Sequence, residues 1–311
     1  MGALSMALIV LVGVAAIVAA IAAAAEARFL RRVDAEAEEL IARPRATPAS
    51  PASMVRREDL ERMPPPVRRW LEASGVVDRE RAVVVRLKQR GDLRTSPTGP
   101  WMPAEAEQYF SVDEPGFVWR VKTRMLGVVP VTGRDRYAGG HGEMLIKAAS
   151  LVDVVDARDE KISAGSMLRF LGEIVWFPSA ALRPYIAWEA IDEVRARATM
   201  AHGGRSVSAV FTFDDRGRVR EVRAERYFGG GPDAKLTPWF VPCTEWQVVR
   251  GVRIPTRGSV VWTLPDGDFD YFRWEILDVE ANVPALYRHH PARVRPSPAL
   301  PSLTTSRRSA S

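Results

Sequence analysis

The spacing of apolar residues near the amino terminus is helical. Residues 3–25 carry no charged side chain. A helix of this length extends about 34 Å, enough to cross a bilayer core of about 30 Å. The helical spacing continues beyond this segment on a face formed by Leu30, Val33, Ala37, Leu40 and Ile41. The pattern therefore predicts a long helix whose first part spans a membrane.

Two interpretations of this first segment compete. A cleaved signal peptide would end at small residues such as Ala22–Ala24. Such a peptide has basic residues before an apolar run of about 7–15 residues, whereas this run is longer and has none before it. We therefore favour an uncleaved single-pass anchor over residues 1–27, in the cell (inner) membrane. The basic residues that follow, Arg28, Arg31 and Arg32, favour a cytoplasmic position for the remainder of the chain.

Residues 28–54 are interpreted as a juxtamembrane helix followed by a proline-rich linker. A short helix is predicted next, with Pro65 and Pro66 near its first turn and Gly75 at its end. Everything from residue 55 to residue 280 is assigned to one β-rich domain, because the period of the apolar residues changes to two after residue 83.

Strict alternation of apolar and polar residues marks the strands of this domain. Val83, Val85 and Leu87 share one face of the first strand, and basic residues occupy the other. Turn sequences at 214–217 and 265–267 separate later strands. We count about eleven strands without βαβ alternation, which predicts a mainly β fold with a strongly curved antiparallel sheet, a barrel or a half-barrel.

Residues 163–178 interrupt the alternation with helical spacing. Ser163 or Ser166 is the expected N-cap, and Pro178 the expected end. Arg169 and Glu173 form an i,i+4 pair on a narrow polar stripe, and most of the remaining surface is apolar. A helix of this kind cannot face water broadly, so it is expected to cover the concave face of the sheet, to contact a ligand or to contact the bilayer.

Charge is unevenly distributed along the chain. The net charge is +6, and residues 281–311 contain five arginines and no acidic residue. This proline- and serine-rich segment is predicted to be a disordered basic tail. The body of the chain is nearly neutral, which argues against a nucleic-acid partner. The single cysteine, Cys243, excludes an intramolecular disulfide, and we interpret it as a small apolar strand residue.

The helix and nearby strands bring many large apolar residues together. They could line a concave site for a lipid or the lipid part of another protein. The alternative is that they fill the core of a ligand-free structural or protein-interaction module. The candidate ligand-binding residues are Trp101, Trp119, Met167, Phe170, Leu171, Ile174, Trp176 and Phe177.

Catalysis receives weaker support from the sequence. Asp135 and His141 flank a Gly-Gly turn and, with Glu173, could serve acid–base chemistry. The sequence contains no serine-hydrolase elbow, zinc-protease helix or phosphate-binding P-loop, so no catalytic residue, metal site or cofactor is predicted. Residues 229–231 are predicted to form a turn rather than a phosphate loop.

Several segments together resemble an uncharacterised bacterial membrane-anchored family. The resembling segments are 64–71, 101–110, 115–119, 169–178 and 251–256, which span nearly all of the predicted domain. Ala104 and Trp70 depart from the expected Phe and Tyr. The family has no assigned catalytic residues, so none is transferred. The resemblance implies a fold similar to the half-barrel of periplasmic lipoprotein carriers, which would place the domain on the extracytoplasmic side.

Overall fold

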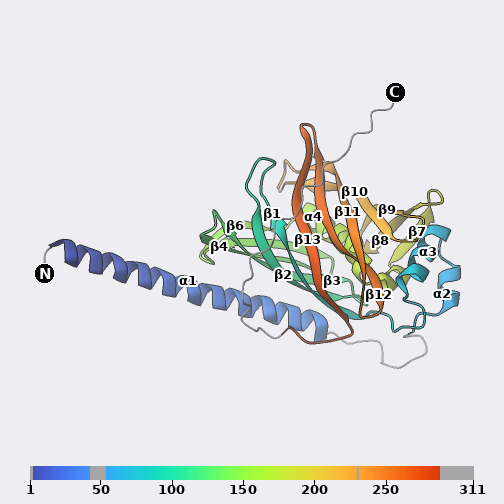
Figure 1. Cartoon of the computed structure of the whole chain (residues 1–311), viewed down its shortest axis with the longest axis horizontal. Coiled ribbons are helices and arrows are strands. Elements are labelled where there is room, and N and C mark those ends of the chain that lie inside the picture. Colours follow the sequence, from blue (N-terminus) through green and yellow to red (C-terminus); the bar gives the residue numbers. More distant parts are fainter. Residues whose placement is uncertain (1–2, 43–53, 230, 288–311) are drawn as a thin grey trace.

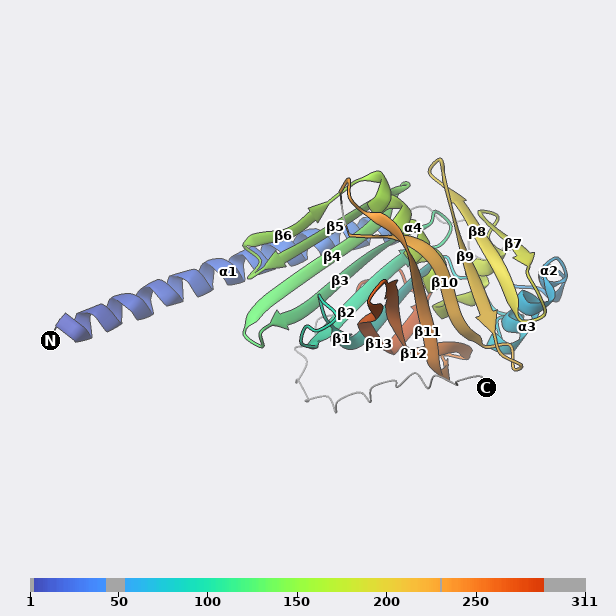
Figure 2. The ribbon, with the colours of Figure 1, turned by 90° about the horizontal axis from the view of Figure 1, so that it is seen from above.

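The strands of the computed structural model form one antiparallel sheet, curled into a half-barrel (Figures 1 and 2). The structure describes residues 3–42, 54–229 and 231–287. Their thirteen strands are β1 (Val84–Leu93), β2 (Met102–Ser111), β3 (Gly116–Met125), β4 (Val129–Ala138), β5 (His141–Ala148), β6 (Val152–Ala157), β7 (Ile186–Ala190), β8 (Arg195–His202), β9 (Arg205–Phe213), β10 (Val219–Phe228), β11 (Lys235–Val249), β12 (Val252–Leu264) and β13 (Gly267–Ala281).

The order of the strands confirms the predicted curved sheet. It runs β6-β5-β4-β3-β2-β1-β13-β12-β11-β10-β9-β8-β7, so that the first and last strands pair at its centre. The predicted turns at 214–217 and 265–267 join β9 to β10 and β12 to β13. The number of strands exceeds the predicted eleven. The edge strands β6 and β7 have six and five residues, too few for a strong alternating pattern.

A single helix, α1 (Ala3–Ala42), extends from the apolar amino-terminal segment onto the outer face of the sheet (Figures 1 and 2). Its last turns pack against strand residues that include Tyr109 and Val118. The helix residues buried there are Phe29, Val33, Ala37, Leu40 and Ile41, four of which belong to the apolar face predicted from the sequence.

Ion pairs join the same part of α1 to neighbouring strands. Glu26 contacts Lys122 with 2.9 Å between carboxylate oxygen and Nζ, and Asp34 pairs with Arg120. Glu36 lies 3.2 Å from Nε of Arg134, which is only 1% exposed. The part of α1 from Glu26 onward therefore belongs to the folded domain.

The amino-terminal part of α1 has the properties of a membrane-spanning segment. The span Ile9–Ala42 contains an 18-residue window with a mean hydropathy of 2.5, and none of that window is buried. A single-pass anchor and a signal sequence both have these properties. The proline-rich segment that follows, residues 43–53, lies outside the described residues.

The helix α4 (Glu160–Glu173) crosses the concave face, as predicted. Its start differs from the prediction: Asp159 is the N-cap and accepts a hydrogen bond from the Ile162 backbone N–H. The Ser163 hydroxyl instead joins the helix to β5, where it accepts a hydrogen bond from the Gly142 backbone N–H. The end also differs from the predicted Pro178. The α-helix ends at Glu173 and is followed by the 3₁₀ turns η2 (Ile174–Trp176) and η3 (Pro178–Leu182).

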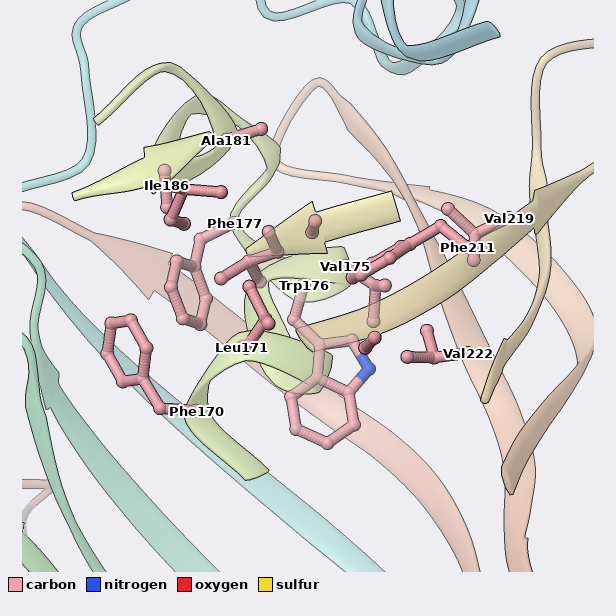
Figure 3. Packing of buried hydrophobic residues seen from close by; sticks show 14 of the residues in the cluster. Phe170, Leu171, Val175, Trp176, Phe177, Ala181, Ile186, Phe211, Val219 and Val222 are labelled. Carbon is pink, nitrogen blue, oxygen red and sulfur yellow. The ribbon is translucent and has the colours of Figure 1, made fainter. Parts of the chain in front are cut away.

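Large apolar side chains fill the space between α4, η2 and the sheet (Figure 3). The ring centroids of Phe110 and Phe177 lie 4.7 Å apart, and those of Trp176 and Trp274 lie 5.3 Å apart. Cys243 is buried in the same core, as predicted, and burial raises the pKa of its thiol to about 12. The helix α4 therefore packs into the centre of the domain.

Two short helices close one end of the half-barrel, α2 (Arg57–Glu61) and α3 (Pro65–Ser74). The predicted boundaries of α3 are confirmed. Pro65 occupies its first turn, and Gly75 ends it with a φ of 75°, a left-handed conformation that glycine adopts at little cost. Trp70 packs against Phe211 with 6.1 Å between ring centroids.

The segment predicted as a basic tail, 281–311, is described only as far as Tyr287. The Asn282 side-chain oxygen accepts a hydrogen bond from the Val83 backbone N–H. Tyr287 is 9% exposed and lies against Tyr109, beside the end of α1. The described start of this segment therefore packs on the domain, and residues 288–311 lie outside the described residues.

Candidate functional site

The residues predicted to bind a ligand divide into two groups in the structure. Trp119 is half-buried on the concave face of β3, and Trp101 is half-buried between the guanidinium groups of Arg94 and Arg273. The other six are 6% exposed or less and belong to the main core: Met167, Phe170, Leu171, Ile174, Trp176 and Phe177.

Beside this core, the polar stripe of α4 forms a buried ionic cluster. The guanidinium of Arg169 donates hydrogen bonds of 2.7 Å to Asp135 on β4 and to Glu173 one turn farther along α4. Glu173 also accepts a hydrogen bond of 2.7 Å from the Gln108 amide on β2. The Arg169 guanidinium lies 4.6 Å from the ring centroid of Trp119. The predicted i,i+4 pair is thus confirmed, and it extends to two strands.

The electrostatics of this cluster are dominated by burial. Burial raises the pKa of the Asp135 and Glu173 carboxyl groups above their ordinary values, and the Arg169 guanidinium opposes that rise. Two carboxylates share this guanidinium, which makes the positive charge of Arg169 necessary for keeping them in the interior.

A second arginine lies on the concave face, on β10. The Arg226 guanidinium is 5.3 Å from the ring centroid of Trp239 and 5.7 Å from that of Trp262. Gly165 on α4 permits this approach, because a Cβ there would lie only 3.3 Å from Arg226 Nε. The Nε atom itself is buried and has no hydrogen-bond partner among the described residues.

Other polar atoms on this face share that property. Gln89 is 2% exposed, and neither its amide oxygen nor its amide nitrogen has a partner within the described part of the chain. The same holds for the buried indole nitrogens of Trp119 and Trp239. Buried polar groups are nearly always hydrogen-bonded, and leaving one unpaired costs about 1–3 kcal/mol. The concave face therefore holds several donors and acceptors that find no partner among the residues that the structure describes.

Small apolar residues lie next to these polar atoms. In the register of the sheet, Gln89 stands beside Ala106 of β2 and Ile276 of β13. Ala106, Ala104 and Val121 form a separate apolar cluster, against which Leu93 and Trp119 pack. We call the combination the concave-face site. It joins an apolar floor to the polar groups of Gln89, Trp119, Arg169, Arg226 and Trp239.

Part of this site could have been identified from the sequence. Gln89 follows Val85 and Leu87 on the inward face of β1, and Arg226 follows Val222 and Ala224 in the same way on β10. A polar residue that continues the apolar face of a strand is the signal in the sequence that points to such positions. The contacts of these residues with α4 depend on the curl of the sheet and leave no local signal.

A surface cleft of about 270 Å³ opens near the amino terminus of α4. The predicted ligand-binding residues do not line it. Its lining is mostly polar: Glu160, Lys161, Ala164, Arg205, Ser206 and Tyr227.

The acid–base residues considered from the sequence do not form one group. Asp135 and Glu173 both contact Arg169, whereas His141 is exposed at the start of β5. Gly229 and Gly231 have positive φ in the segment between β10 and β11, and residue 230 lies outside the described residues. Within residues 3–42, 54–229 and 231–287, no group of three or more His, Cys, Asp or Glu side chains is placed to hold a metal ion.

A family model covers most of the half-barrel and its concave face, matching residues 53–274. The chain belongs to DUF6544, a family of unknown function. The expected membership of an uncharacterised family is thus confirmed. No curated protein is significantly similar in sequence to this DUF6544 chain.

Three solved structures show a distant likeness to the DUF6544 chain. A DUF1329 family protein from Desulfovibrio piger has a TM-score of 0.40 and 7% identity, over 74% of this chain and 94% of its own. A LolA superfamily protein from Nitrosomonas europaea has a TM-score of 0.38 and 12% identity, over 68% and 92%. A domain from Vibrio parahaemolyticus, described as an outer membrane lipoprotein-sorting protein domain, has a TM-score of 0.33 and 7% identity, over 64% and 85%. At these scores the likenesses support no argument about function.

Proposed function

We propose that this protein is a membrane-tethered binding module that holds a lipid, or the lipid part of another protein, at the concave-face site. The observation that carries the proposal is the buried amide of Gln89, which has no hydrogen-bond partner in the described part of the chain and lies beside the apolar cluster of Ala104, Ala106 and Val121. An amphipathic ligand would supply an alkyl chain to the apolar residues and hydrogen-bonding groups to the polar ones.

The two arginines suit the polar end of such a ligand. Arg169 is hydrogen-bonded to two carboxylates. The positive charge of Arg226 also lowers the pKa of the Asp135 carboxyl, but its Nε atom has no hydrogen-bond partner among the described residues. A guanidinium that stacks on indole rings presents its edge to carboxylate or phosphate oxygens. We therefore assign recognition of an anionic or strongly polar head group to Arg226 on β10, and a hydrogen bond to another part of the ligand to Gln89 on β1.

The proposal treats α1 as an uncleaved anchor. The same helix that is apolar over residues 3–25 packs on the sheet through Phe29, Val33 and Leu40 without an interruption between the two parts. We therefore expect the mature protein to retain the apolar segment of residues 3–25. The mass of the intact protein purified from membranes, measured by mass spectrometry, checks this directly.

Native mass spectrometry of the full chain, released from detergent micelles, tests ligand binding. We expect the wild type to retain a bound lipid and Arg226→Met to lose it. Arg223→Met is the matched control, because Arg223 lies on the same strand and is 49% exposed at its side chain. Equal lipid retention by both variants, or no lipid on the wild type, would contradict the proposal.

Gln89 gives a separate test based on stability. In the ligand-free chain, Gln89→Leu should raise the free energy of unfolding by about 1–3 kcal/mol, because it removes an amide that pays a desolvation penalty without a partner. Gln108→Leu is the control and should destabilise, since the Gln108 amide donates to Glu173. Urea denaturation measures both. Destabilisation by Gln89→Leu comparable to that by Gln108→Leu would show that the Gln89 amide is satisfied in the free protein.

A ligand-free structural or interaction module is the second candidate. It is favoured by the packing around α4, where Phe170, Leu171 and Ile174 are fully buried. The two candidates differ in their expectation for the wild type, because a structural module releases no lipid in the native mass spectrum.

A further inference from the structure

Two turns of the sheet extend in the same direction as the apolar part of α1 (Figures 1 and 2). One turn joins β3 to β4 and the other joins β5 to β6. The register pairs Val131 with Ala148, which places both turns at the same end of the sheet. Figure 2 shows these strand ends beside α1, on the side toward its amino terminus.

The contacts of α1 fix this direction independently of the view. Asp34 pairs with Arg120 on β3, and Glu26, two turns earlier in the helix, pairs with Lys122. Moving toward the amino terminus of α1 therefore means moving toward the end of β3 at Met125. Glu26 is the first charged residue after the apolar segment. Met125 lies three residues beyond Lys122, up to about 10 Å farther along the strand.

Both turns and the strand ends beside them expose large apolar side chains. We call these side chains the apolar rim. Single exposed apolar residues are common on protein surfaces, but a group of them on adjacent turns marks a surface that contacts something. The rim consists of Met125, Leu126, Val128, Leu151, Val152 and Val154, whose exposed fractions run from 41% to 76%.

The backbone conformation of the β3–β4 turn makes the presence of an exposed leucine there informative. Leu126 has a φ of 52° and is 76% exposed. Glycine or asparagine adopts this left-handed conformation most readily, and a leucine there costs about 1–2 kcal/mol. An exposed leucine at such a position gains nothing from the folded domain itself. One exposed basic residue, Arg124, stands just behind the turn and suits anionic lipid head groups.

We propose that the apolar rim inserts into the interfacial region of the same bilayer that α1 spans. This inference rests on the membrane anchor of the proposed function. The rim extends past the level of Glu26, and the interfacial layer that amphipathic segments occupy is about 5–10 Å deep. The domain would thus contact the membrane through α1 and through the apolar rim. Together these two contacts would fix the orientation of its outer face relative to the bilayer.

Fluorescence quenching in proteoliposomes tests the inference on the full chain. Single cysteines are introduced at Leu126 and Val152, labelled with an environment-sensitive fluorophore and reconstituted into vesicles of phosphatidylcholine and phosphatidylglycerol that contain spin-labelled lipid. Val248 is the matched control: it is 58% exposed and lies near the β11–β12 turn, at the opposite end of the strands. The native Cys243 is buried and is replaced by alanine in every variant.

We expect a blue shift and quenching at positions 126 and 152 and neither at position 248. A label at Val14 reports on the anchor separately. Quenching at Val14 without quenching at the two rim positions would overturn the rim contact and leave the anchor intact, whereas no quenching at Val14 would overturn the anchor itself. A blue shift at the rim that spin-labelled lipid does not quench would show a protein partner or a second copy there, and would also overturn the inference.

Discussion

A chain that begins at residue 53 should be about 5 kcal/mol less stable than one that begins at Glu26. The shorter chain retains the whole sheet but loses the last turns of α1. Those turns bury Phe29, Val33, Leu40 and Ile41 on the outer face of the half-barrel. Burial of one such side chain stabilises by about 1.5–3 kcal/mol, and the entropy of ordering the helix offsets part of the sum.

Urea denaturation of the two truncated chains measures this difference. The chain that begins at Glu26 is the control, because it removes the apolar segment and keeps every described contact between α1 and the sheet. The free energy of unfolding of this control should equal that of the full chain measured in detergent. Equal stability of the two truncated chains would contradict this prediction. It would mean that packing of the helix against Tyr109 and Val118 does not stabilise the domain, and that the domain begins after residue 53.

Replacement of Arg169 by methionine should lower the free energy of unfolding by about 3–5 kcal/mol at neutral pH. The substitution keeps an apolar stem but leaves the carboxylates of Asp135 and Glu173 without their shared guanidinium. Removing one partner of a buried ion pair costs this much because the remaining charge stays desolvated. Arg158→Met is the control. Arg158 pairs with Asp156 at the surface, and exposed pairs contribute about 0–1 kcal/mol.

Acidification should reduce the defect of the Arg169 variant. Burial already raises the pKa of both carboxyl groups in the wild type, and loss of the guanidinium raises it further. Between the ordinary pKa and the raised one, the folded variant binds more protons than the unfolded chain, so its free energy of unfolding increases as the pH falls. Denaturation curves at several pH values check the sign. A defect that grows with acidification would show that the two carboxylates remain charged without Arg169.

Most of the fold could be predicted from local patterns. Alternation along β1 and β3 identified inward and outward faces, and the proline and glycine residues of α3 set its ends, because these signals depend on neighbours in the sequence. The predicted start of α4 is wrong because Ser163 and Asp159 can both cap a helix. The structure uses Asp159 as the cap and Ser163 to hold β5.

The candidate site was predictable only in part. The aromatic and apolar residues between Met167 and Phe177 could be predicted as a group because they follow one another at helical spacing, yet all six candidates among them pack in the core. Gln108, Asp135 and Arg226 come from three strands and meet α4 only because the sheet curls around it. Asp135 is close in sequence to His141, but its partner in the structure is Arg169. Contacts between residues so far apart in the chain produce no regular spacing in the sequence from which they could be predicted.

The unbroken course of α1 limits how the domain can work. The segment from Phe29 to Ile41, about 20 Å of helix, packs along the sheet. It continues the apolar turns before it as one α-helix without a break. If those turns lie in a bilayer, the domain cannot swing out on a tether or shuttle between two membranes. Its concave face would then stay at a constant height and angle, and a lipid of the kind proposed would reach it by lateral diffusion within the plane of a single membrane.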